Sequence, residues 1–312
     1  MKTCAACRED LPKDKFSKKQ WKLNQRRCKA CVRDNREVQQ LPVTTSNKPG
    51  DCEVVSSLLG SMSISDQITP ISDEELFKKT PPNEDCPICF LRLPSMSTGW
   101  KCMTCCGENI CSGCFWAVIE RSDCKMNCPF CRAPAVTSSK ESNKRIKKLV
   151  EKNNAYAIYS LGCHYDNGDF GLPQSYAKAL EFWHRAADLG CAAAYHNIGT
   201  YYDRGTGVEM DNEKAKHYYT SAAMLGHIGA RYNLGLGEDY FGSKDRALKH
   251  WMIAVMGEDA DALENIKRLY MEGHATKDDY TKALRSYQEC LDEIRSDQRD
   301  EAAAYDDELK YY

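Results

Sequence analysis

The sequence predicts a multidomain chain in which two small cysteine-rich modules precede an all-α helical-repeat solenoid. Two observations lead to this prediction. Of 18 cysteines, 15 fall within residues 1–131, most of them in CxxC pairs. From residue 155 onward, a pattern of small and aromatic residues returns after 36 positions, which is the signature of stacked helix pairs. The front half therefore depends on its cysteines, and the back half on apolar packing.

The composition predicts that the cysteines bind zinc. The start, MKTCAACRED, has no apolar leader, and no stretch is long and apolar enough to span a membrane. We therefore expect a cytoplasmic or nuclear protein in a reducing compartment, where clustered cysteines bind metal more often than they form disulfides. All seven histidines lie beyond residue 160, so sites in the front half must use thiolates alone. Four thiolates suit structural zinc, and we expect about three ions per chain.

Composition shifts divide the chain into six segments. Residues 41–82 are rich in Ser and Pro and predict a disordered linker. Within it, Ser72 and Glu75 have capping-box spacing, which favours a transient turn in the linker or, alternatively, the start of one short helix. The predicted segments are a metal module over 1–40, the linker over 41–82, a second metal module over 83–135, a basic connector helix over 140–152, helical repeats over 155–295 and an acidic cap or tail over 296–312.

The N-terminal module carries two CxxC pairs, Cys4/Cys7 and Cys28/Cys31, whose spacing is a strong zinc signal. The surrounding residues resemble small treble-clef or zinc-ribbon modules. Residues 1–40 hold 12 Lys and Arg against 5 Asp and Glu. This positive charge suits contact with nucleic-acid phosphates or with an acidic protein face, and a merely solvated basic surface is the alternative. Because the formal net charge of the whole chain is −2, no global field favours nucleic acid.

The second module has a dense run of cysteines, CPIC, then KCMTCCGENICSGC, then CPFC. Its spacing resembles an all-cysteine RING finger. In that family alternate pairs share a zinc ion, which implies two interleaved sets of ligands. The family usually separates its third and fourth ligands, so Cys102 is an alternative to Cys105. The implied sets are Cys86, Cys89, Cys111 and Cys114 for one site, and Cys105, Cys106, Cys128 and Cys131 for the other.

The RING resemblance also implies a docking surface for a ubiquitin-conjugating enzyme. The family places a hydrophobic residue within the first CxxC, apolar residues after the third pair, a proline within the last CxxC and a basic residue after it. Arg suits this last position because its guanidinium can bridge two partners. The residues at these positions are Ile88, Phe115, Trp116, Pro129 and Arg132.

The repeats beyond residue 155 show glycines and aromatic residues at matching positions. Gly162, Gly199 and Gly235 recur in the first helix of each unit, where we expect stacked helices to cross closely. The pattern resembles Sel-1-like repeats, relatives of the tetratricopeptide class, with about four copies. The resemblance implies a scaffold that recruits a protein partner.

Two functions from different classes follow. The leading hypothesis is a RING-type ubiquitin ligase that positions a ubiquitin-loaded conjugating enzyme without a nucleophile of its own, while the repeats recruit the substrate. The alternative is a non-catalytic, zinc-dependent adaptor, linked to chromatin or RNA. A nucleic-acid function for the basic N-terminal module would show as binding that weakens steeply with salt.

Overall fold

A computed structural model describes the backbone of two short strands near the N-terminus, together with residues 71–78, 84–95, 99–121, 127–306 and 309–310. The chain divides into two units, Met1–Thr69 and Pro70–Tyr312. In the first unit, β1 (Lys2–Thr3) pairs with β2 (Asp10–Leu11) in antiparallel register. The predicted ligands Cys4, Cys7, Cys28 and Cys31 lie outside the described residues, as does most of the predicted linker.

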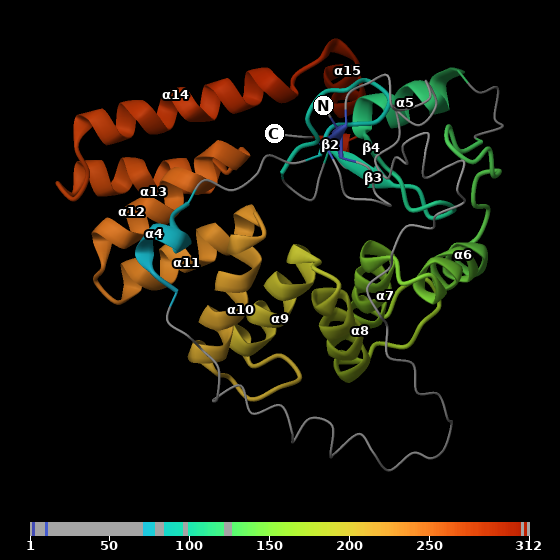
Figure 1. The fold of residues 1–312 in the computed structure, drawn as a ribbon, viewed down its shortest axis with the longest axis horizontal. Coiled ribbons are helices and arrows are strands. Elements are labelled where there is room, and N and C mark those ends of the chain that lie inside the picture. Colours follow the sequence, from blue (N-terminus) through green and yellow to red (C-terminus); the bar gives the residue numbers. More distant parts are fainter. Residues whose placement is uncertain are drawn as a thin grey trace. The chain divides into compact units, whose positions relative to one another are not determined.

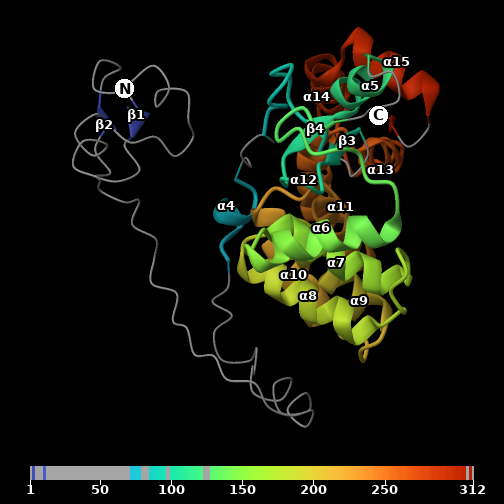
Figure 2. The same cartoon turned by 90° about the vertical axis from the view of Figure 1, so that its right-hand side faces the viewer.

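Helices stacked in consecutive pairs make up most of the second unit, and we call α6–α14 the helical array (Figure 1). Each pair is an antiparallel hairpin whose small residues face the neighbouring helix. Figure 1 shows the helices following one another along the array, and Figure 2 shows the same array from the side where α6 lies. The helices are α6 (Ser139–Glu151), α7 (Ala155–Asn167), α8 (Tyr176–Asp188), α9 (Ala192–Arg204), α10 (Asn212–Met224), α11 (Ile228–Tyr240), α12 (Lys244–Ala254) with the 3₁₀ turn η3 (Val255–Gly257), α13 (Ala260–Met271) and α14 (Lys277–Ile294).

The recurring glycines make room for an aromatic ring from the second helix of the same pair. A Cβ added at Gly162 would lie 2.6 Å from the Trp183 ring, and one at Gly235 would lie 2.4 Å from Trp251 Nε1. Gly199 faces Tyr219 in the same way. The aromatic rings therefore fill each pair internally, whereas the sequence suggested close approach between stacked backbones. This burial compensates the roughly 1 kcal/mol that a glycine costs inside a helix.

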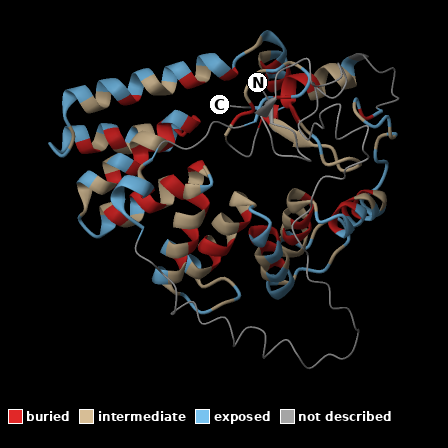
Figure 3. Cartoon of the chain, viewed as in Figure 1, coloured by how far each residue is buried: buried red, intermediate tan, exposed pale blue. Residues whose placement is uncertain are grey.

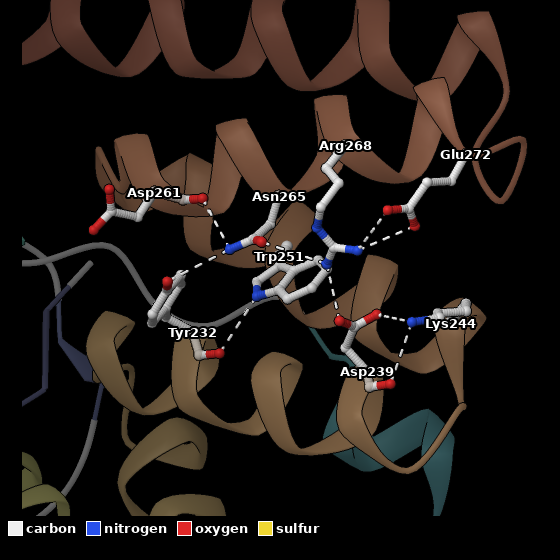
Figure 4. Close-up of polar contacts among 8 residues, drawn as sticks. All are labelled: Tyr232, Asp239, Lys244, Trp251, Asp261, Asn265, Arg268 and Glu272. Carbon is white, nitrogen blue, oxygen red and sulfur yellow. Dashed lines mark hydrogen bonds and ion pairs between the residues drawn. The ribbon is translucent and has the colours of Figure 1, made fainter.

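Polar contacts join the last helix pair to the one before it, although the repeat pattern is worn there (Figure 4). Arg268 of α13 donates to Asp239 of α11 at 2.9 Å, and its guanidinium lies 5.8 Å from the centre of the Trp251 ring. The indole Nε1 of Trp251 donates to the Tyr232 carbonyl at 3.3 Å. Lys244 pairs with the same Asp239 carboxylate at 2.6 Å. An ion-pair network around a buried indole thus adds to the apolar core that joins these helices.

The second module contains a two-stranded sheet and one helix, and we call residues 84–134 the cysteine-rich block. Strand β3 (Trp100–Cys102) pairs antiparallel with β4 (Asn109–Cys111), and α5 (Ser112–Arg121) follows directly. Apart from cysteines, the buried apolar side chains among the described residues of the block are Leu93, Pro94 and Ile110. Figure 3 shows how little buried surface it has beside the array. Its apolar core alone is too small to stabilise it.

The linker predicted over 41–82 does not extend through its last part. Helix α4 (Asp73–Leu76) begins at Ser72, whose side chain accepts a hydrogen bond from the Glu75 amide at 3.3 Å. The capping-box spacing thus starts a short helix, the alternative to the transient turn that the sequence favoured. Leu76 is buried, because the segment packs against α11 and α12.

The acidic C-terminal segment, predicted as a polar cap or tail, forms a helix that packs on the cysteine-rich block. Helix α15 (Asp297–Tyr305) packs on α5 of the cysteine-rich block, with Arg299, Ala302 and Ala303 buried. A Cβ added at Gly113 would lie 2.7 Å from the Arg299 amide nitrogen, so glycine permits this close contact. The sequence DEAAAY looked polar, but its alanines form an apolar face.

The block contacts both ends of the helical array. The Trp100 and Tyr156 rings lie 5.2 Å apart at α7. At the other end, buried Glu258 accepts from Arg92 at 2.7 Å and from the Ser95 amide at 2.8 Å. Among the helices that the structure describes, none is both long and apolar enough to cross a membrane.

Candidate metal centre and its groove

Eight cysteines of the block gather in two groups of four. Within each group the Sγ atoms all lie within 4.8 Å of one another. These groups have the same members as the two ligand sets that the RING resemblance implied. The first thiol group is Cys86, Cys89, Cys111 and Cys114, and the second thiol group is Cys105, Cys106, Cys128 and Cys131.

Two similar turns position the first and last CxxC pairs. In the first turn, the Phe90 amide donates to the Cys86 carbonyl at 2.9 Å, and Phe90 adopts a left-handed φ of 62°. In the last turn, the Arg132 amide donates to the Cys128 carbonyl at 2.9 Å, with a φ of 60° at Arg132. A bridge between extended residues closes each turn, Asp85 to Arg92 and Asn127 to Pro134. Each tight turn directs two sulfurs toward one point.

The sulfur spacing fits a tetrahedral ion. A zinc ion about 2.3 Å from each of four sulfurs requires neighbouring sulfurs to be about 3.8 Å apart. The Sγ atoms of Cys89 and Cys111 are separated by 3.7 Å, as are those of Cys106 and Cys128. Four soft donors leave no open position, which is typical of a structural site. Both groups can therefore hold a metal ion such as zinc.

Without a cation, the grouped thiols cannot all ionise. A hydrogen bond from Cys111 lowers the pKa of Cys86 to about 4, while burial raises the pKa of Cys114 to about 12. The second group shows the same division. Burial raises the pKa of Cys106 to about 11, whereas at Cys128 burial is outweighed by backbone and thiol hydrogen bonds, which lower its pKa to about 7. One thiolate per group forms first and opposes ionisation of the others. A divalent cation would remove this conflict.

Arg299 of α15 brings a buried positive charge to the first thiol group. Its side chain donates to the Ile294 carbonyl at 2.5 Å and to the Leu91 carbonyl at 3.5 Å. The hydrogen bond to Cys86 and burial raise the pKa of Cys111 overall. The hydrogen bond and positive charge of Arg299 act against this rise and favour the Cys111 thiolate. A tetrathiolate site with a divalent ion carries a net negative charge, so a neighbouring guanidinium suits it. No sequence pattern indicated this contact.

Cys105, and not the alternative Cys102, joins the second thiol group. Cys102 lies at the end of β3, where burial raises its pKa to about 12. Cys124, the other cysteine that the implied ligand sets leave out, lies outside the described residues.

A groove of about 390 Å³ lies between the two thiol groups and α5. Two of its residues, Ile88 and Pro129, come from the first and last CxxC turns and were predicted from the sequence. Ala117 and Val118 of α5 provide the apolar wall, and Asn127 and Gln298 are polar. The lining residues are Ile88, Cys114, Ala117, Val118, Asn127, Pro129 and Gln298.

Phe115 and Trp116, which the sequence assigned to this surface, have other neighbours. Phe115 packs against the buried core of the block, and the Trp116 ring lies 4.0 Å from the Tyr305 ring of α15. Arg132 is exposed at the end of the last CxxC turn and does not line the groove. Gln298, which does line it, was missed because nothing in the sequence links α15 to the block.

The helical array matches a known repeat family. Residues 155–191 and 192–227 match the Sel1 repeat, which covers the pairs α7–α8 and α9–α10. These repeats support a protein-interaction or adaptor function for the array. The family match covers less than a quarter of the chain and does not extend to the cysteine-rich block.

Similar proteins share part of the chain. It is 34% identical over 88 residues to an ERAD-associated E3 ubiquitin-protein ligase component, HRD3B, from Arabidopsis thaliana, over 28% of this chain and 13% of that protein. It is 25% identical over 122 residues to chitin synthase regulatory factor 2 from Schizosaccharomyces pombe, over 38% of this chain and 23% of that protein. The matched regions thus span less than a quarter of either relative.

Solved structures resemble part of the chain as well. A Sel1 repeat protein from Oxalobacter formigenes is 28% identical, with a TM-score of 0.44, covering 49% of this chain and 64% of that one. A protective antigen from uropathogenic Escherichia coli, c5321, is 24% identical with a TM-score of 0.42, covering 52% and 35%.

Proposed function

We propose that this chain is a RING-type ubiquitin ligase in which the cysteine-rich block binds a ubiquitin-loaded conjugating enzyme and the Sel1 repeats recruit the substrate. The observation that carries the proposal is the apolar groove between two interleaved thiol groups. Ile88 from the first turn, Pro129 from the last turn and Val118 from α5 converge there. This is the combination of turns and helix that the RING resemblance implies.

Zinc is the metal proposed for both thiol groups, with a third ion in the N-terminal module. Bound zinc would hold the two CxxC turns at a fixed separation, so that Ile88 and Pro129 keep their places beside α5. The ions would be structural, since each has four sulfur ligands and no position for water or substrate. Binding of this kind contributes on the order of 10 kcal/mol per site to folding.

The proposed ligase acts by positioning. The conjugating enzyme carries ubiquitin as a thioester, and a substrate lysine attacks that bond. The groove would hold the conjugating enzyme through its apolar residues, and exposed Arg132 would donate hydrogen bonds at the junction with ubiquitin. Holding reactants in an attack-ready arrangement raises the rate without a nucleophile on the ligase.

A reconstituted ubiquitination reaction tests this function. The zinc-loaded full chain is combined with an activating enzyme, ubiquitin and a panel of conjugating enzymes, and ubiquitin-chain formation is measured. With a cognate conjugating enzyme, we expect the wild type to form chains, and Ile88→Ala and Arg132→Ala to lower the rate at least about tenfold, a loss of about 1.4 kcal/mol of transition-state stabilisation.

Val136→Ala is the matched control. Val136 is an aliphatic residue of similar exposure, 36% against 39% for Ile88, and it does not line the groove. We expect this variant to retain wild-type activity. Absence of chain formation with every conjugating enzyme, in a protein shown to contain zinc, would reject the ligase proposal.

One observation favours a second candidate, a non-catalytic zinc-dependent adaptor. Helix α15 covers part of α5, and Trp116 packs on Tyr305, so the free apolar surface is smaller than the sequence suggested. An adaptor of this kind would bind its partners without the groove. Its partners would therefore remain bound to the Ile88→Ala variant in pull-down experiments.

A further inference from the structure

The helical array contains an occupied binding site for a short acidic segment of its own chain. The α4 segment, Ile71–Lys78, lies against α11 and α12 (Figure 1). It carries three carboxylates in succession, Asp73, Glu74 and Glu75, followed by Leu76 and Phe77. It is separated by more than 150 positions in sequence from the residues that it contacts.

Two arginines of the array bind the backbone and the first carboxylate of this segment. Arg231 of α11 donates to the Leu76 carbonyl at 2.6 Å, where the last carbonyls of α4 have no partner within the helix. Arg246 of α12 forms an ion pair with Asp73 and also contacts Glu238 at 3.3 Å. Arg231 thus contacts the C-terminal end of the segment, and Arg246 contacts its acidic N-terminal end.

The ring of Phe77 is held by charged and aromatic groups. The Arg246 guanidinium lies 5.4 Å and the Lys249 ammonium 5.3 Å from its centre. The His250 ring lies 4.7 Å away at a tilted angle. Cations over an aromatic face are attracted by its quadrupole, so an aromatic residue is favoured at this position. These contacts select for the side chain that follows Leu76.

Two buried polar side chains in the site have hydrogen-bonding capacity that the α4 segment does not use. His250 is 0% exposed and Arg231 is 1% exposed. Among the described residues, neither ring nitrogen of His250 has a hydrogen-bond partner, and neither does Nε of Arg231. Burying unpaired polar groups costs about 1–3 kcal/mol each. These atoms are therefore free to hydrogen-bond a polar ligand that replaces the α4 segment.

The α4 segment is a weak occupant. It has a single helical turn, which cannot persist in isolation because helix nucleation is unfavourable. Of its eight residues, only Leu76 is fully buried. Because the segment is attached to the same chain, its effective concentration at the site is on the order of millimolar. At this concentration a modest affinity is enough to keep the site occupied. Such an occupant can be displaced by a segment with better contacts.

We propose that the α11–α12 face is a recognition site for acidic segments that end in Leu and an aromatic residue, and that the α4 segment occupies it in cis until a partner protein presents the same chemistry. The partner would offer a carboxylate to Arg246, a carbonyl to Arg231 and an aromatic ring to Lys249 and His250. This deepens the substrate-recruiting part of the proposed function. Its test measures peptide binding and does not depend on ubiquitin transfer, so the two can fail separately.

The test uses a fluorescent peptide with the sequence of residues 70–80 and measures its binding to the full chain by anisotropy. In the wild type, the resident segment competes with the peptide. Phe77→Ala in the chain weakens this competitor, so we expect the peptide to bind this opened chain at least about tenfold more tightly than the wild type. The same peptide with Phe77→Ala should bind neither chain.

A charge exchange tests the specificity of the contact. In the opened chain, Arg246→Glu should lower the affinity for the peptide at least about tenfold, and a peptide with Asp73→Lys should recover much of the loss. Lys267→Glu is the control, because Lys267 lies on α13 and pairs with Glu264 away from the site. Far-UV circular dichroism should show that all variants retain the helical array.

Either of two results would overturn the proposal. The first is an opened chain, with its array intact, that fails to bind the peptide at about 1 mM, the concentration that tethering supplies. The second is equal binding to the Arg246→Glu and Lys267→Glu variants. Asp73→Lys in the chain is a second way to open the site if Phe77→Ala lowers solubility, and it should strengthen binding of the unmodified peptide.

Discussion

The cysteine-rich block and the helical array are stabilised by different means. Half of the buried side chains in the described part of the block are cysteines, and the others are small or aliphatic, such as Leu93 and Ile110. The array instead buries alanines around large aromatic rings, such as Trp183 and Trp251. The first region should therefore depend on metal, and the second on packing. The contrast teaches that a short segment can replace a core by bonds to an ion.

The largest expected effect comes from removing the metal. A strong chelator should remove on the order of 10 kcal/mol of folding energy per site, because the block has almost no other core. Hydrogen exchange followed by mass spectrometry should show lost protection in β4 and α5, while α7–α12 remain protected. If β4 and α5 keep their amide protection after complete metal removal, the block does not depend on metal.

Packing should dominate in the array. Trp183→Ala removes a ring that is 1% exposed and packed against Gly162, so we expect a loss of about 3–5 kcal/mol in the free energy of unfolding. Urea unfolding followed by circular dichroism measures this loss, and metal content should not change. Tyr240→Ala is the control, since Tyr240 is 85% exposed and should change stability by less than about 0.5 kcal/mol. Equal losses in the two variants would refute the packing account.

Arg299 links the end of α14 to the cysteine-rich block. Its replacement therefore tests whether this contact supports metal binding. Arg299→Met removes the positive charge beside Cys111 and should weaken metal binding at the first thiol group by about 10–100-fold. Competition with a chromophoric chelator measures this change, and the second thiol group should be unaffected. Arg132→Met, which removes an exposed charge, is the control. Unchanged affinity at the first group would show that α15 has no role in the metal site.

The smallest effect concerns acid sensitivity of the array. Burial lowers the pKa of His227 to about 3, and its Nδ1 accepts a hydrogen bond from the Ala230 amide at the start of α11. The unfolded chain, with a histidine pKa of about 6.5, binds the proton first. The resulting stability is therefore present above pH 6.5 and is lost as the pH falls toward 3. Lowering the pH from 7.5 to 5.5 should cost about 1.4 kcal/mol at this residue.

His227→Asn removes this titration but keeps the helix cap, since Asn154 caps α7 at the equivalent position. Urea unfolding at both pH values should show that the variant loses about 1.4 kcal/mol less stability than the wild type. An identical pH dependence in the two proteins would show that His227 is not the sensitive group.

The sequence predicted the parts of the fold that repeat. The 36-residue period indicated helix pairs, and the glycines marked close contacts because they recur at the same position of each repeat. The RING resemblance implied the membership of both thiol groups. It also pointed to Ile88 and Pro129, because the CxxC turns fix their positions locally.

Contacts between distant segments were not predictable in the same way. Nothing in the sequence near Asp73 indicates that Arg231 and Arg246 lie beside it. Phe115 and Trp116 looked like surface residues after a CxxC pair, yet the Trp116 ring packs against Tyr305 of α15. Such contacts depend on how the array and the block meet, which no local pattern encodes.

Zinc content, measured by mass spectrometry under non-denaturing conditions, is the most direct test that the cysteine groups hold metal ions. We expect three zinc ions in the wild type and two in Cys105→Ser. Cys102→Ser should retain three, because Cys102 lies outside the second thiol group. A wild-type chain that is folded and contains no zinc would contradict the account.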